Sequence, residues 1–175
     1  MGITLHAAFV PSCQQILASV ARLVGKAEAF CAEGGLPPAD IIDARLAGDM
    51  YPFAYQVKST VAHSVGAIEG VRRGEFRPDT RPLLDNFADL KALVEEAITT
   101  LGAIDPDEME RFVGRDMRFV FGENGLDFTA EQFLLSFSQP NFYFHATTAY
   151  DILRWKGLPI GKRDFNGRVR VKAKA

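Results

Sequence analysis

The chain has few cysteines, and this scarcity excludes one class of fold. Its 175 residues include only two, Cys13 and Cys31. If both lie on one helix, their separation of 18 positions corresponds to about five turns, or ~27 Å, which is beyond disulfide reach. A small secreted fold held by disulfides is therefore excluded. We expect buried thiols and a cytoplasmic location.

Net charge and long apolar runs are scarce as well. The formal charge is only -2, which gives no general basis for binding nucleic acid or an anionic membrane. No stretch approaches the ~20 apolar residues of a membrane span, and the N-terminus does not read as a signal peptide. Gly-rich phosphate loops, nucleophile elbows and Cys-x-x-Cys pairs are also missing. We therefore expect neither a nucleic-acid nor a membrane partner.

Helical periodicity is the strongest signal that is present. The length and the 47% hydrophobic content fit one domain, residues 1–175. Apolar spacing predicts long helices over residues 4–33, 52–73, 87–101 and 140–157. Shorter helices are predicted over residues 40–45, 106–114 and 129–137. The basic segment 160–175 is expected to be a solvated loop and tail.

One strand signal interrupts the helices. Arg118–Phe121 and Leu126–Phe128 flank the turn-rich segment 122–125, which predicts a hairpin. Its phenylalanines are too apolar to be fully hydrated, so the hairpin is either a cover for the bundle end or an interface element. Together these elements predict an all-α four-helix bundle with a small β-hairpin inserted before the last helix.

Two of the three histidines, His63 and His145, lie in helical segments of apolar and small residues. With ~100° per residue, His63 lies nearly opposite a wedge of charged side chains on its helix, and His145 lies on the inner face of the last helix. Each imidazole then needs a hydrogen-bond partner or a metal ion. The charged wedge comprises Lys58, Glu69, Arg72 and Arg73. The side chains expected to line a pocket around the rings are Gln56, Ser59, Thr148 and Ile152.

The chain resembles an uncharacterised branch of the DinB-like superfamily, domain of unknown function 1993, in ARLAGDMYPFAYQV (Ala44–Val57) and PNFYFHATTAYDILRWKGLPIGKRDF (Pro140–Phe165). The resemblance covers most of the chain and implies a DinB-like four-helix bundle. In the wider family, a histidine on the second helix and an H-x-x-x-H pair on the last helix bind a divalent metal. His63 and His145 match two of these positions, and Asn141 stands at the third.

Two hypotheses remain open. In the first, His63, His145 and the Asn141 oxygen hold one divalent metal ion, zinc or nickel. The resemblance implies that this metal would assist hydrolysis or thiol transfer on a small molecule. In the second, the same residues line a metal-free cavity of a non-catalytic ligand-binding or structural module. The sequence does not decide whether the chain is an enzyme, and we expect a homodimer in either case.

Overall fold

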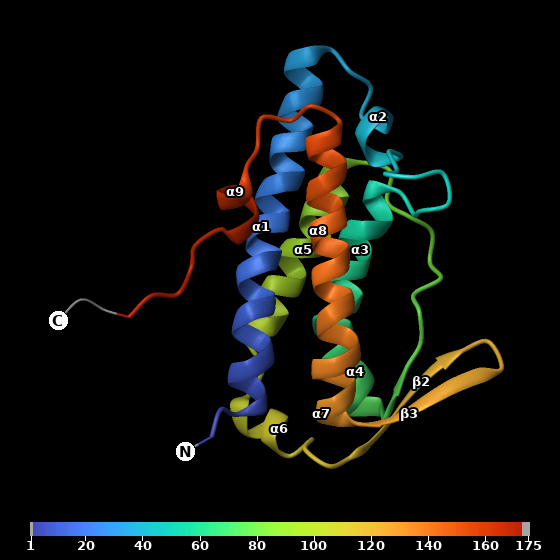
Figure 1. Cartoon of the computed structure of the whole chain (residues 1–175), viewed down its shortest axis with the longest axis vertical. Coiled ribbons are helices and arrows are strands. Elements are labelled where there is room, and N and C mark those ends of the chain that lie inside the picture. Colours follow the sequence, from blue (N-terminus) through green and yellow to red (C-terminus); the bar gives the residue numbers. More distant parts are fainter. Residues whose placement is uncertain (1, 173–175) are drawn as a thin grey trace.

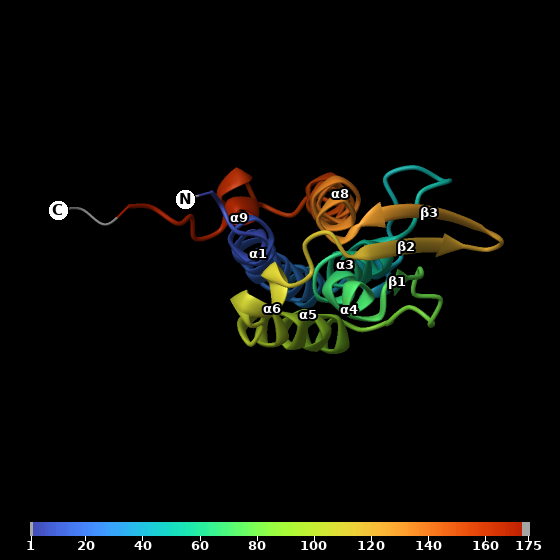
Figure 2. The ribbon, with the colours of Figure 1, turned by 90° about the horizontal axis from the view of Figure 1, so that it is seen from below.

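The computed structural model describes residues 2–172, and its long helices form a bundle (Figure 1). The bundle consists of α1 (Leu5–Gly34), the column of α3 (Phe53–Ala62) and α4 (Val65–Arg73), α5 (Phe87–Gly102) and α8 (Gln139–Trp155). Both α1 and α3 pack against α5 and α8, so α1 and α3 face each other across the bundle (Figure 2). The short helices are α2 (Ala39–Ile42), α6 (Pro106–Glu110), α7 (Ala130–Gln132) and α9 (Lys162–Asn166).

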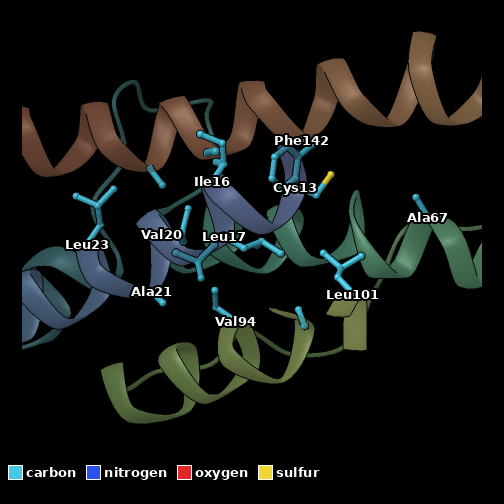
Figure 3. Close-up of a cluster of buried hydrophobic side chains, with 14 of the residues drawn as sticks. Cys13, Ile16, Leu17, Val20, Ala21, Leu23, Ala67, Val94, Leu101 and Phe142 are labelled. Atoms are coloured by element: carbon cyan, nitrogen blue, oxygen red, sulfur yellow. The ribbon is translucent and has the colours of Figure 1, made fainter. Parts of the chain in front are cut away.

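Apolar side chains from all of the long helices fill the centre of the bundle (Figure 3). Leu17 and Val20 of α1 meet Val94 of α5, and Phe142 of α8 is fully buried. The apolar residues that define the predicted helical periodicity therefore lie on the inner faces of the helices, as the hydrophobic effect requires.

Helix α1 is an exception to the expectation that no stretch of the chain approaches the length and apolar character of a membrane span. By length and composition alone, Leu5–Gly34 could cross a membrane. However, 56% of its most apolar window is buried inside the chain. The core packing of the bundle therefore accounts for this composition.

A small sheet lies beside one end of the bundle (Figure 1). Strands β2 (Asp116–Phe121) and β3 (Asn124–Thr129) form the predicted hairpin, but its connection is two residues long, because Phe121 pairs with Asn124. Gly122 has a φ of +60°, which a glycine adopts without strain. Strand β1 (Glu75–Phe76) pairs in parallel with β2 and was not predicted, since two residues carry no periodic signal.

The helix predicted over residues 52–73 is interrupted at His63 and Ser64. The Ser64 hydroxyl donates to the carbonyl of Thr60 at 2.7 Å, so a side chain competes with the backbone for a helical acceptor.

A second irregularity precedes the last helix, where Phe133–Ser138 form the π-helix η1. Pro140 lacks an N–H, and Gln139 N donates to Leu134 O five residues back. The predicted helices over 129–137 and 140–157 are therefore one continuous column.

The basic C-terminal segment, expected to be a solvated loop and tail, contains one short helix. Its described basic residues are exposed: Lys162, Arg163, Arg168, Arg170 and Lys172. Residues Lys162–Asn166 form α9, whose first turn is held by Asp164 Oδ2, which accepts from Gly161 N at 2.8 Å. Asp164 also pairs with Lys26 of α1 at 2.6 Å, and Arg170 donates to the Pro11 carbonyl at 2.6 Å. Polar contacts with α1 therefore hold this segment on the bundle. Lys174 lies outside the described residues.

Candidate functional site

A cavity of about 300 Å³ lies between α3, the junction of η1 and α8, and the small sheet. Segments far apart in the sequence form its wall. These are Tyr55, Ser59 and His63 at α3, Phe137, Asn141 and His145 at the η1–α8 junction, and Phe76 and Phe119 in the strands. The sheet therefore forms part of the cavity wall, on the side of the bundle where the two imidazoles lie side by side.

His145 has a fixed tautomer. The buried Gln56 amide donates from Nε2 to the Tyr51 carbonyl at 2.9 Å, so its Oε1 faces His145 Nδ1 at 2.7 Å. An amide oxygen can only accept, and we assign the imidazole proton to Nδ1 from this network. His145 Nε2 then keeps its lone pair and is the ring nitrogen left for a ligand.

His63 lies where the two helical irregularities meet. Its ring nitrogen Nδ1 is 3.4 Å from Ser138 Oγ, a long contact between the break after α3 and the last residue of η1. Ser138 is fully buried, so the contact turns Nδ1 of His63 away from solvent. π-Helical segments frequently occur at functional sites. Here the irregular backbone brings Ser138 to His63.

The two imidazoles lie side by side and are both neutral. Their centroids are 5.7 Å apart and their planes differ by 15°. Burial lowers the pKa of each ring from 6.5 to about 4, and His145 adds to the lowering at His63. At neutral pH the rings can therefore accept a hydrogen bond or ligate a metal, but they offer no positive charge.

The structure distributes the other predicted site residues differently. Ser59 and Asn141 line the cavity, and Gln56 lies behind His145 as its hydrogen-bond partner. The Thr148 hydroxyl donates to the Phe144 carbonyl at 2.8 Å within its own helix. Ile152 is fully buried in the hydrophobic core.

Lys58 is a cavity residue that the helical phase places incorrectly. It was assigned to the charged wedge, yet it is only 8% exposed. Its Nζ lies 3.3 Å from Asp79 Oδ1 and donates to the carbonyls of Asp79 and Arg81. The loop after β1 thus covers this lysine. No local sequence signal marks that contact, because Asp79 lies 21 positions away.

The donor set is a poor fit for a resident zinc or nickel ion. Two imidazole nitrogens are available, and Asn141 contributes at most Oδ1, because its Nδ2 donates to the Phe137 carbonyl at 2.8 Å. Among residues 2–172, no group of three histidine, cysteine, aspartate or glutamate side chains is placed to hold a metal. Protein zinc sites use at least three such ligands, and an amide oxygen binds transition metals weakly.

Comparison with known proteins identifies the fold. The family model described as "Domain of unknown function (DUF1993)" matches residues 5–166. The chain is also similar to the crystal structure of a DinB family member protein from Shewanella denitrificans. That similarity has a TM-score of 0.80 at 23% identity and covers 97% of this chain and 96% of the other. It confirms the predicted DinB-like helical fold with a hairpin before the last long helix. No curated protein matches the chain.

Proposed function

The chain belongs to the DUF1993 family, and from this premise we propose that it binds a small molecule in the cavity beside His63 and His145 without a resident metal. The fixed tautomer of His145 is the observation that carries the proposal. Gln56 and the Tyr51 carbonyl hold one ring nitrogen, so the other is preorganised as an acceptor. Such an arrangement suits recognition, because few polar groups in a largely aromatic cavity fix the orientation of a ligand.

The geometry supports binding more than catalysis. A general base works best when its pKa lies near the operating pH, whereas burial lowers the pKa of both imidazoles to about 4. Ser138, whose Oγ lies 3.4 Å from His63 Nδ1, is fully buried and forms no part of the described cavity wall. A substrate in the cavity would therefore not reach it, and we do not assign it the role of a nucleophile.

The proposal can be tested by NMR on protein labelled with ¹⁵N at histidine. Phenol, benzoate and benzylamine are titrated separately to millimolar concentration at pH 7. Saturable shifts of the His63 and His145 ring nitrogens, with His6 in α1 unaffected as the internal reference, are the expected result. If none of the three probes shifts either ring, the cavity is not a small-molecule site and the proposal fails.

A loosely held divalent metal is the second candidate. The observation in its favour is that both Nδ1 atoms face buried partners, Gln56 and Ser138. Metal-bound histidines are commonly held in this way through their other ring nitrogen. Zinc or nickel would then bind through both Nε2 atoms, with Asn141 and water completing the shell. Incubation of untagged protein with zinc separates the candidates. Binding of one equivalent that is lost in His63→Ala and His145→Ala supports the metal, and protein that stays metal-free excludes it.

A further inference from the structure

The charges in the cavity wall are already satisfied. Within the described chain, the charged side chains of the wall are Lys58 and Asp79. An ammonium group has three N–H donors, and three acceptors surround that of Lys58: Asp79 Oδ1 and the carbonyls of Asp79 and Arg81. Asp79 also accepts from the Arg81 guanidinium at 2.7 Å. A charged ligand would therefore lose its hydration without gaining a free counter-ion, which is costly.

The remaining wall is largely aromatic. Tyr51 and Tyr55 stack on each other with ring centroids 3.9 Å apart. Phe119 of the hairpin and Phe137 of η1 meet at 4.8 Å, and Phe76 packs against Phe119 at 6.2 Å. Aromatic walls favour flat aromatic ligands, because offset and edge-on ring contacts add to the gain from apolar burial.

Nε2 of His145 is a hydrogen-bond acceptor, and no described residue donates to it. Nδ1 of the same ring is hydrogen-bonded to Gln56, which lies outside the cavity wall, while the ring itself lines the cavity. A buried ligand that met this lone pair without an N–H or O–H would leave it unsatisfied. The ligand is therefore expected to carry a donor.

We propose that the cavity takes an uncharged, flat aromatic or heteroaromatic molecule that donates one hydrogen bond to His145 Nε2. This inference rests on the proposed small-molecule function and names its ligand class. The volume of about 300 Å³ suits a molecule of one or two rings, at the small end of protein ligand sites.

The test compares four one-ring probes by titration at pH 7, with the ¹⁵N shifts of His145 as readout. Phenol has the ring and the donor, anisole has the ring without the donor, and benzoate and benzylamine are charged. Phenol should bind about tenfold more tightly than anisole, the effect of one hydrogen bond. Benzoate and benzylamine should bind more weakly than both.

Variants connect the preference to His145. In His145→Phe, where binding is read from the ¹⁵N shifts of His63 in the same cavity, phenol and anisole should bind equally, because the acceptor is lost while the ring volume is kept. If that variant does not fold, Gln56→Met serves instead, since removing the amide frees the tautomer and should reduce the preference for phenol. Thr99→Ala, which changes an exposed residue of α5 outside the cavity wall, is the control and should leave the ratio unchanged.

Three results would overturn the inference. Equal binding of phenol and anisole to the native chain would refute the donor requirement. Tighter binding of benzoate or benzylamine would refute the uncharged class, yet it would leave the small-molecule function standing. No shift with any probe would refute the ligand class together with the proposed function itself.

Discussion

At the residue scale, the two neutral histidines should make the fold sensitive to acid. Their pKa values are about 4 in the folded chain, because burial disfavours the imidazolium, against 6.5 for an exposed histidine. Between these values the unfolded chain binds more protons, so the free energy of unfolding falls as pH falls from about 6.5 to 4. Above pH 6.5 the imidazoles are neutral in both states and no longer change the free energy of unfolding. The total decrease from pH 6.5 to 4 is roughly 3 kcal/mol per histidine as an upper estimate.

Urea unfolding at pH 7 and pH 4.5 measures this dependence. The carboxylates titrate in the same range, so the informative quantity is the difference between variants. His145→Gln should lose about half of the histidine contribution to the pH slope. His6→Gln, which removes a histidine outside the cavity, is the matched control. A His145→Gln slope equal to that of the native chain would show that this ring is not held neutral by the fold.

Asn141 is the residue that separates this site from a three-histidine site. It lies four positions before His145 on α8, so both side chains lie on the same side of the helix. Asn141→His supplies a third imidazole and should raise zinc affinity at least about tenfold, since zinc prefers three or more nitrogen or sulfur ligands. Competition with a zinc chelator measures the change.

Two observations would contradict the conclusion that His63, His145 and Asn141 hold zinc poorly. Asn141→Ala is the control for the missing ligand and should bring no gain in zinc affinity. If Asn141→His gained nothing either, the Nε2 atoms would not converge on a common point. If the native chain kept one equivalent of zinc after dialysis, two imidazoles would suffice and the metal-free proposal would be wrong.

At the scale of elements, the regular helices were predictable because their signals are local. The starts and ends of α1 and α5 lie within one residue of their predicted positions. The Asn86 side chain accepts from Asp89 N at 2.8 Å, and Gly35 takes the left-handed conformation that ends α1. The helix break at Ser64 has no such local signal. A serine hydroxyl can compete for a backbone acceptor in any helix, and only packing decides whether the helix breaks.

The candidate site was predictable only in part. Helical phase placed His63 and His145 each on the inner side of its helix, and in the structure their ring centroids are 5.7 Å apart. It could not reveal that Gln56 locks His145 or that Asp79 covers Lys58, since each contact joins separate elements. Strand β1 was not predicted for the same reason, because its two residues form a strand only through pairing with β2.

The C-terminal segment offers a test at this scale. Gly167 has a φ of +60°, and a Cβ there would overlap Ser19 Oγ and Arg22 Nη2 of α1. Gly167→Ala should therefore loosen residues 161–170 and cost about 1–3 kcal/mol of stability. Limited proteolysis should show earlier cleavage in this segment, together with a lower Tm. Gly161→Ala meets nothing within 4 Å and is the matched control. Equal protection of both variants would contradict the packing argument.

At the scale of the whole molecule, α8 carries cavity-lining residues on one face and exposed aromatic residues on another. His145 and Asn141 line the cavity, whereas Phe144 and Trp155 are 55% and 63% exposed. These two aromatic residues are 11 positions apart, which is about three turns and places them on the same outer face. A second copy of this helix face would cover both side chains, and contiguous apolar surface of that kind marks interaction sites.

We therefore expect a homodimer in which the outer faces of two α8 helices meet around a twofold axis. Sedimentation velocity over the micromolar range should report a dimer for the native chain. The double variant Phe144→Ser, Trp155→Ser should shift it to monomer, whereas Val113→Ser, which changes a residue that is 52% exposed near α6, should not. Phe144 packs against His145 with ring centroids 5.3 Å apart, so the monomeric variant should also shift the His145 ring resonances. A native chain that stays monomeric throughout this range would leave these aromatic residues without a dimer role.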